Sequence, residues 1–329
     1  MTCCDFHRAY ADVSVAVIGA AGFIGRWVSR MLTAAGAHLH TSIRSRSDAG
    51  ILAAYDVACE CVVLDVGDTT RLRDWLSNIR PAVVFNLAGY GVRRLERDER
   101  IAWRVNASFL SELCAAVECC RDSAWPGQAL IHAGSALEYG AIGGDLSEES
   151  AANPTTLYGR SKLAGSLNLQ HVCDRLGIRG LTARLFTVYG PGEPSGRLLP
   201  SLIEAARTGT PIALTAGAQR RDFTYVEDVA EGLLRLGLCR DVKPGSIVNL
   251  ASGRLHSVRE FVETAAQLLD IPRHLLRFGA IPTRPEEMSH VDVNNARLRM
   301  LTGWAPSDLI GAGISKSMRF ERVREVILT

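Results

Sequence analysis

The sequence contains no apolar run close to the ~20 residues that a membrane-spanning helix requires. Residues 1–12 carry charges and lack the apolar stretch typical of a signal peptide. Acidic and basic side chains nearly balance, at 35 and 37 with a formal net charge of +2, so the clustered basic surface of a nucleic-acid-binding protein is not expected. We therefore expect a cytoplasmic protein with neither membrane nor nucleic-acid partners.

Cysteine is frequent, but its arrangement fits neither a metal site nor a disulfide framework. The nine cysteines include no C-x-x-C pair, and no two histidines lie at the spacing typical of zinc ligands. The odd number also means that the thiols cannot all pair. These observations favour free thiols in a reducing compartment, and we predict no metal site.

Short apolar runs alternate with longer amphipathic stretches through the first two-thirds of the chain. The short runs are typical of buried strands, and they cover Val13–Gly19, His38–Ile43, Cys61–Asp65, Ala82–Leu87, Ala129–Ala133 and Gly180–Leu185. The longer stretches have the length and spacing of helices, and they cover Gly22–Ala35, Thr69–Ile79, Arg97–Cys120 and Leu157–Leu176. This alternation predicts an α/β fold in which helices cover both faces of a parallel sheet.

A glycine triplet joins the first predicted strand to the first predicted helix. Gly19 permits a tight turn, Gly22 lets backbone amides approach a pyrophosphate, and Gly25 lets helix and strand pack closely. The helix start, at Phe23 and Ile24, then presents N–H groups and a partial positive charge to phosphates. The triplet therefore predicts a dinucleotide-binding site.

The end of the second predicted strand lacks the acid that would bond the ribose 2′-hydroxyl of NAD. Arg44 and Arg46 occur there instead, and no carboxylate precedes Asp48. Because a guanidinium can grip a 2′-phosphate, this loop favours NADP(H) over NAD(H), although the two arginines also suit a solvated loop. Asp65, at the end of the third strand, can bond the adenine edge or cap the following helix.

Tyr158 and Lys162 are four residues apart and so share one face of a predicted helix. A phenol with an ordinary pKa of about 10 is a poor base at neutral pH, but a neighbouring ammonium group lowers that pKa. Ser135, at the end of the fifth strand, can donate a hydrogen bond to a substrate oxygen. Together the three side chains predict acid–base chemistry beside a nicotinamide.

Six ordered motifs and a C-terminal signature, between residues 13 and 306, resemble the extended short-chain dehydrogenase/reductase family. This is the NAD-dependent epimerase/dehydratase group, which acts on nucleotide sugars. The motifs are Gly19/Gly22/Gly25, Asn86–Gly89, Ser135–Gly140, Tyr158/Lys162, Arg184–Pro191 and Arg221–Asp228, and the signature is Arg284 with Leu301–Pro306. The resemblance implies a Rossmann-type doubly wound parallel sheet with a small, interleaved C-terminal substrate domain.

Because Ser246–Leu250 has the pattern of a strand that returns to the sheet, each domain takes two segments of the chain. We assign residues 1–187 and 225–262 to the dinucleotide-binding domain. Residues 188–224 and 263–329 would then form the substrate domain, which closes over a nucleoside-diphosphate sugar.

The resemblance also implies roles for individual residues. Tyr158 would be the acid/base, Lys162 its partner and Ser135 the donor to the substrate oxygen. Further cofactor contacts are expected at Val66, Leu87, Ala88, Gly89, Phe186 and Val188. Substrate contacts are expected at Ala136, Glu138, Thr187, Arg197, Arg221 and Arg284.

Some of these substrate assignments have alternatives. Arg221 and Arg284 would hold the diphosphate, but Arg221 could instead pair with Asp222 or Asp228, and Arg284 could be a solvated charge. Glu138 could contact the hexose or face solvent.

Departures from the family pattern narrow the activity. Ala136 and Leu137 stand where 4,6-dehydratases carry an acid and a base, so a dehydratase is not expected. Thr187 replaces the Asn of epimerases and several reductases, and Glu138 is similar to the acid of GDP-sugar 4-ketoreductases. A 4-keto-6-deoxysugar reductase is therefore favoured over a 4-epimerase that retains NAD, and over a non-catalytic dinucleotide-binding sensor.

Family members often dimerise through a helix bundle. We expect a homodimer formed by the helices around residues 97–120 and 157–176, with apolar positions Ile101, Val105, Leu110 and Leu113 available for it.

Overall fold

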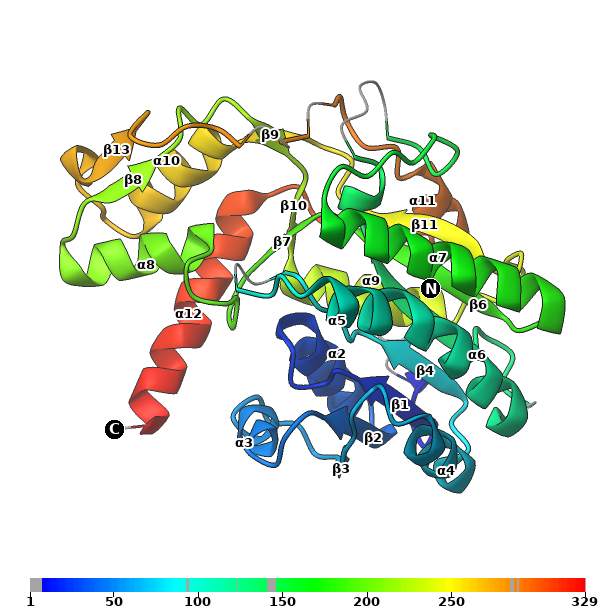
Figure 1. Ribbon diagram of the computed structural model, residues 1–329. Coiled ribbons are helices and arrows are strands. Elements are labelled where there is room, and N and C mark those ends of the chain that lie inside the picture. Colours follow the sequence, from blue (N-terminus) through cyan, green and yellow to red (C-terminus); the bar gives the residue numbers. More distant parts are fainter. Residues whose placement is uncertain are drawn as a thin grey trace.

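The computed structural model describes residues 8–92, 95–122, 124–140, 146–284, 287–288 and 290–328. Seven parallel strands form its central sheet (Figure 1), in the order β11-β6-β5-β4-β1-β2-β3. The strands are β1 (Ser14–Ile18), β2 (His38–Ile43), β3 (Glu60–Val63), β4 (Val83–Asn86), β5 (Leu130–Ser135), β6 (Gly180–Leu185) and β11 (Ser246–Leu250). The predicted Rossmann-type doubly wound sheet is confirmed, and the order reverses between β1 and β4, which places the ligand crevice at their carboxyl ends.

Alternate residues of each strand face opposite layers of helices, as the pleat requires. Val15 and Val17 of β1 belong to one apolar cluster, whereas Ala16 and Ile18 belong to the other. The first face is covered by α2 (Phe23–Ala34) and α9 (Val226–Gly237), and the second by α4 (Thr69–Ile79), α6 (Phe109–Cys120) and α7 (Leu157–Leu176). Burial on both faces explains why the strands are almost uninterrupted apolar runs.

Local capping fixes the ends of the helices. Thr156 accepts a hydrogen bond from the amide of Gly159 at the start of α7, and Gly177 ends that helix in the left-handed conformation with φ of +64°. Asp68 caps α4 by accepting from the amide of Arg71, so the capping role considered for Asp65 falls to Asp68.

The single helix expected over residues 97–120 is interrupted. It consists of α5 (Glu99–Trp103), a π-helical turn (Arg104–Ser108) and α6. Asn106 in the π turn is fully buried; its Oδ1 accepts from the amide of Tyr90, and its Nδ2 donates to the Tyr90 carbonyl and to Ser161 Oγ. The turn therefore ties the loop after β4 to helix α7, which fits the frequent occurrence of π turns at functional sites.

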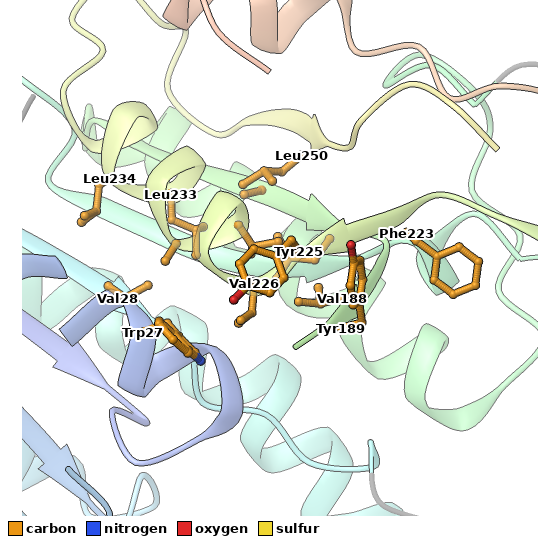
Figure 2. Close-up of a cluster of buried hydrophobic side chains, with 14 of the residues drawn as sticks. Trp27, Val28, Val188, Tyr189, Phe223, Tyr225, Val226, Leu233, Leu234 and Leu250 are labelled. Carbon is orange, nitrogen blue, oxygen red and sulfur yellow. The ribbon is translucent and has the colours of Figure 1, made fainter. Parts of the chain in front are cut away.

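The smaller part of the molecule lies beside the sheet (Figure 1). Its elements are α8 (Leu198–Thr208), β8 (Ile212–Leu214), α10 (Val258–Leu268), β13 (Leu276–Phe278) and α12 (Ile310–Leu328). Two short parallel strands, β7 (Thr187–Tyr189) and β10 (Phe223–Tyr225), connect the two parts. Figure 2 shows the side chains of β7 and β10 in one apolar cluster with Trp27 and Val28 of α2, so the two parts share a core.

The remaining elements are short: α3 (Asp48–Ala53), β9 (Arg220–Arg221), β12 (His256–Ser257), α11 (Ala296–Thr302) and 3-10 turns at Ala136–Glu138 and Arg273–Leu275. The predicted domain boundary at residue 262 falls inside α10, which packs against α8 and α12 of the smaller part. Helix α11, in contrast, packs on β11 and α9 of the sheet. The division is therefore better drawn before Val258, with α11 on the side of the sheet.

Trp27 of α2 contacts two segments that are distant in the sequence, the loop after β7 and helix α12. Its Nε1 donates to the carbonyl oxygen of Pro191 at 2.9 Å, in the loop after β7. Its ring also lies 5.0 Å from that of Phe320 in α12 and packs edge-on against Tyr55. The helix that begins at the glycine turn is thus held by both parts of the molecule.

Within the described ranges, no helix combines the length and the apolar character needed to cross a bilayer.

Candidate active site

The glycine turn between β1 and α2 has the geometry expected of a pyrophosphate cradle. Gly19 has φ of +78°, and a Cβ on Gly25 would lie 2.2 Å from the Gly19 carbonyl oxygen. Helix α2 begins with Gly22 as its N-cap, without a side-chain cap and without an acid in its first turn. Its first N–H groups, at Phe23 and Ile24, are therefore suited to bind phosphate oxygens.

The loop after β4 lies directly against this turn. A Cβ on Gly19 would be 2.8 Å from the amide nitrogen of Ala88, so Leu87, Ala88 and Gly89 border the same crevice. Gly91, further along the loop, has φ of +103°, and a Cβ there would lie 3.1 Å from the ring of Tyr158. The close approach of this glycine to the phenol was not expected from the sequence.

At the end of β2, Arg44 and Arg46 are exposed. Asp48 Oδ2 accepts hydrogen bonds from the amides of Arg44 and Ser45, both at 3.1 Å, so its carboxylate stabilises the backbone of this loop. Arg46 lines an open hollow together with Arg71 of α4. These features fit the adenosine end of a dinucleotide.

Asp65 and Val66 follow β3 at the same edge of the sheet. Asp65 Oδ1 accepts from the amide of Gly67 at 2.8 Å and from Arg104 Nη2 at 2.9 Å. The hydrogen bond from Gly67, followed by Arg104, holds the pKa of this carboxyl below its usual value. Asp65 is therefore ionised, exposed and able to accept a further hydrogen bond from a ligand.

Ser135 and Tyr158 come together at the carboxyl end of β5. Ser135 Oγ accepts from the amide of Leu137 at 3.2 Å and lies close enough to the side chain of Tyr158 to lower the pKa of its phenol. Because the Leu137 amide already donates to this oxygen, the hydroxyl proton of Ser135 is available for Tyr158 or for a ligand oxygen.

Burial raises the pKa of Tyr158 to about 12, and the negative charge of Glu138 acts in the same direction. The hydrogen bond from Ser135 and the charge of Arg197 offset this only in part. The phenol therefore keeps its proton at neutral pH. In the protein chain by itself this pKa is therefore raised, and not lowered as the spacing of Tyr158 and Lys162 suggested.

Lys162 is almost completely buried, with 2% of its surface exposed. Burial lowers its pKa to about 8, although the nearby Glu138 carboxylate acts against this. Its Nζ lies 3.2 Å from Nε2 of His132, and Nδ1 of His132 lies 3.1 Å from Nδ2 of Asn86. Sequence reasoning missed His132, because a single histidine in an apolar strand carries no signal of its own.

The structure places Glu138 beneath the site, with none of its surface exposed. Its Oε2 accepts from Arg184 Nε at 2.9 Å and from Ser166 Oγ at 3.0 Å, and its Oε1 accepts from the Ser135 amide at 2.8 Å. Neither alternative considered for Glu138, a hexose contact or solvent exposure, is correct. The residue supports Ser135 and balances the buried charge of Arg184.

Arg221 and Arg284, expected at the diphosphate, lie in one neighbourhood. Arg221 makes a two-pronged ion pair with Glu287, with both distances 2.7 Å, and not with Asp222 or Asp228. Arg284 is exposed. It lies one turn from Glu287, because the Glu287 amide donates a hydrogen bond to the Arg284 carbonyl oxygen. The partner of Arg221 was missed because it lies far away in the sequence.

The other residues expected at the substrate lie next to β5, on β7 and in the loop after β7. Arg197 is exposed and close enough to Tyr158 to lower its pKa, and it pairs with the buried Glu193 at 3.1 Å. Ala136 is buried beside Ser135, and Thr187 begins β7. Phe186 and Val188 flank Thr187. Among the described residues, no three His, Cys, Asp or Glu side chains lie together as a metal site.

A family model described as "NAD dependent epimerase/dehydratase family" matches residues 15–251, most of the chain. The chain belongs to this family. The predictions of family and of a nicotinamide-dependent enzyme are thereby confirmed, and the family is one of nucleotide-sugar epimerases, dehydratases and reductases.

Relatives within the family have several activities. A dTDP-6-deoxy-L-talose 4-dehydrogenase (NAD(P)(+)) from Kitasatospora kifunensis is 30% identical over 309 residues, which covers 90% of this chain and 92% of that protein. A UDP-glucose 4-epimerase from Mycolicibacterium smegmatis is 26% identical, covering 93% and 97%. MoeE5, solved in complex with UDP-glucuronic acid and NAD, superposes with a TM-score of 0.79 at 25% identity, covering 94% and 99%. The exact activity of this chain is therefore not fixed by similarity.

The apolar positions considered for a helix bundle need correction. Leu110 and Leu113 are fully buried in the core behind the sheet and are not available to a partner. Among the described residues of these helices, the large apolar side chains that are exposed are Ile101, Trp103 and Leu167.

Proposed function

We propose that the protein is an NAD(P)H-dependent reductase of a nucleoside-diphosphate 4-keto-6-deoxyhexose. The observation that carries this proposal is the position of Tyr158, whose ring lies against Gly91 in the loop after β4 and whose phenol lies close to Ser135. A protonated phenol is a proton donor, which the reduction of a ketone requires. The full-length similarity to a talose 4-dehydrogenase supports the choice of sugar carbon.

The chemistry is a carbonyl reduction. A bound reduced nicotinamide supplies the hydride that the carbonyl carbon accepts. Tyr158 gives its proton to the carbonyl oxygen, so that C=O becomes CH–OH, and Ser135 donates a hydrogen bond to the same oxygen as its negative charge develops. The amide of Leu137 and the buried Glu138 hold Ser135 in place for this role.

Dehydration does not fit this site. The residues after Ser135 are Ala136 and Leu137, whose side chains cannot transfer protons, and Glu138 is enclosed behind them. Tyr158 and Ser135 can move one proton at a carbonyl oxygen, and the described positions Ala136 and Leu137 supply no second acid–base pair to expel water.

NADPH is the proposed reductant because Arg44 and Arg46 are exposed at the end of β2, while Asp48 is used by the backbone. The double variant Arg44→Ala/Arg46→Ala should lower kcat/KM for NADPH about 10- to 100-fold and leave NADH within about twofold. Arg73→Ala, an exposed arginine of α4, is the matched control. Equal losses with both cofactors would contradict the preference.

The assay of the activity combines a dTDP-linked 4-keto-6-deoxyhexose with NADPH and follows cofactor oxidation and the new alcohol by NMR. Tyr158→Phe should lower kcat at least about 100-fold without weakening cofactor binding. Tyr10→Phe, whose phenol donates to the Leu234 carbonyl in the core, controls for loss of a hydroxyl. Unchanged turnover in the Tyr158 variant would defeat the mechanism.

A 4-epimerase is the second candidate, because the Mycolicibacterium relative carries that name. Such an enzyme removes and returns the same hydride and needs no added cofactor. Tightly retained NAD⁺ in the purified protein, with interconversion of UDP-hexoses, would replace the reductase by the epimerase. A non-catalytic sensor would bind the dinucleotide and turn over neither class of sugar.

The substrate diphosphate is proposed to bind Arg221 and Arg284, with Arg197 nearer the sugar. Because Glu287 occupies Arg221, the diphosphate must take its place on the guanidinium. A homodimer is also proposed, through α5 and α7, where Ile101, Trp103 and Leu167 are exposed. Light scattering of Leu167→Glu against the unmodified protein tests the dimer, since a charge there should yield monomers.

A further inference from the structure

The strand β5 carries a buried histidine that points at the lysine of the active site. His132 and Asn86 are both enclosed, with at most 1% of their surfaces exposed, and they are neighbours in register on β5 and β4. The chain of contacts runs from Asn86 Nδ2 to His132 Nδ1 at 3.1 Å, and from His132 Nε2 to Lys162 Nζ at 3.2 Å.

The orientation of the Asn86 amide decides which nitrogen of His132 carries the proton. The amide of Ala88 donates to Asn86 Oδ1 at 3.3 Å, which fixes Oδ1 as the acceptor and leaves Nδ2 to face the imidazole. An NH₂ group only donates, so Nδ1 of His132 must accept. Because burial and the nearby Lys162 keep the pKa of His132 well below its usual value, despite an opposite effect of the Asn86 backbone, the ring is neutral and its proton lies on Nε2.

An N–H on Nε2 can only donate toward Lys162. An ammonium group has three donors and no acceptor, whereas a neutral amine has a lone pair that accepts. We propose that His132 is a positioning residue whose Nε2–H, oriented by Asn86, destabilises the ammonium form of Lys162 relative to its neutral amine. The lowered pKa of Lys162 agrees with this arrangement.

Other charged groups near the amine do not remove this effect. Glu138, from the 3-10 turn after β5, favours the ammonium form of Lys162, but Arg184 of β6 neutralises that carboxylate. Tyr158, on α7 itself, is uncharged at neutral pH. Arg197 and Glu96 act on Tyr158 in opposite directions.

The catalytic consequence rests on the proposed function. The phenol of Tyr158 titrates too high to set the upper limit of activity, so the deprotonation of Lys162 should set it near pH 8. His132 would thereby make the reductase lose activity on the alkaline side at a lower pH than a lysine paired with an acceptor would.

The composition of the chain makes a direct test possible. Lys162, Lys243 and Lys316 are its three lysines, and the last two are exposed. Protein labelled with lysine carrying ¹³C at Cε and ¹⁵N at Nζ gives three resonances to titrate, without substrate or cofactor. The Lys162 resonance should titrate near pH 8, whereas an exposed lysine ordinarily titrates at about 10.4.

Two variants separate the proposal from burial alone. His132→Gln replaces the donor by an amide that can turn its oxygen to the amine, and it should raise the Lys162 midpoint by about one to two pH units. Asn86→Leu keeps the imidazole but frees its tautomer, so it should raise the midpoint in the same direction without touching Lys162. The control is Thr182→Val, in register with His132 on β6, whose hydroxyl has no partner in the structure and whose loss should change nothing.

An unchanged or lowered midpoint in His132→Gln overturns the proposal, as does an unchanged midpoint in Asn86→Leu if the first variant does not fold. In the reductase assay, the alkaline limb of kcat/KM should move upward with the NMR midpoint; a uniform loss of kcat with the limb in place would make His132 merely structural. Absence of reductase turnover would sink the proposed function and leave the NMR result standing.

Discussion

Replacing Glu138 by Gln should destabilise the protein strongly, because it leaves the Arg184 guanidinium buried without its counter-ion. The two side chains are 0% and 3% exposed, and Nε and Oε2 are 2.9 Å apart. Removing one partner of a buried ion pair costs about 3–5 kcal/mol. With an unfolding entropy of about 2.1 cal/mol/K per residue over 329 residues, the melting temperature should fall by about 4–7 °C.

The same substitution should change the proton chemistry of the site. Glu138 raises the pKa of Tyr158 and that of Lys162, so the neutral amide should lower both. Lys162 would then lose its proton at a lower pH than in the unmodified protein. The alkaline limb of kcat/KM should therefore move below pH 8, in the direction opposite to that expected for His132→Gln.

A double-mutant cycle measured by thermal melting at one scan rate separates the ion pair from packing. Arg184→Met keeps an unbranched side chain over the Tyr139 ring, which the guanidinium now covers at 4.3 Å. The double variant should melt no lower than Glu138→Gln alone, with a coupling energy of at least about 2 kcal/mol. The control is Glu204→Gln, which removes an exposed ion pair with Arg207 and should change the melting temperature by no more than about 1 °C. A similarly small change for Glu138→Gln, or additive losses in the double variant, would refute the reasoning.

Glu287→Gln should lower the KM for the nucleotide sugar about three- to tenfold, because an amide competes less well than a carboxylate with the substrate diphosphate for Arg221. Steady-state kinetics measure this KM, with Glu204→Gln as the control, and a raised KM in Glu287→Gln would contradict the prediction. Gly25→Ala should abolish dinucleotide binding in calorimetry, because its Cβ would lie 2.2 Å from a carbonyl oxygen, whereas Gly50→Ala has open space in α3 and should stabilise by about 0.5–1 kcal/mol. Burial raises the pKa of Glu193 to about 7, so its ionisation costs stability as pH rises from its ordinary value through 7. Glu193→Gln should therefore have a higher melting temperature than the unmodified protein at pH 8 and the same melting temperature at pH 4. If the difference in melting temperature is the same at both pH values, the ionisation of Glu193 is not its cause.

The sheet and most helices could be predicted because their signals are local. A strand buried on both faces is an apolar run wherever it occurs, and α4 and α7 have the bounds expected from their capping residues and spacing. The Gly19, Ser135 and Tyr158 positions were identified for the same reason, since each stands at a fixed place relative to a strand or helix end.

The misjudged residues depend on contacts between distant segments. Glu138 lies 46 residues from Arg184, and Arg221 lies 66 residues from Glu287, so neither ion pair has a pattern along the chain. Leu110 and Leu113 fit an outward apolar stripe equally well, and only the packing of α6 on the sheet shows that they face inward. The pKa of Tyr158 likewise follows from enclosure by several elements and not from the spacing of Tyr and Lys.

The bond from the Trp27 indole to the Pro191 carbonyl has a mechanical consequence. It makes the first residues after β7 move with the nucleotide-binding half, although the chain there has already left the main sheet. Any swing of the smaller part over a sugar that leaves α2 in place must therefore bend the backbone beyond Pro191. The pivot would then lie near Glu193 and its ion-pair partner Arg197, whose charge lowers the pKa of Tyr158, so that closing the crevice and setting the charge around the phenol would be one movement.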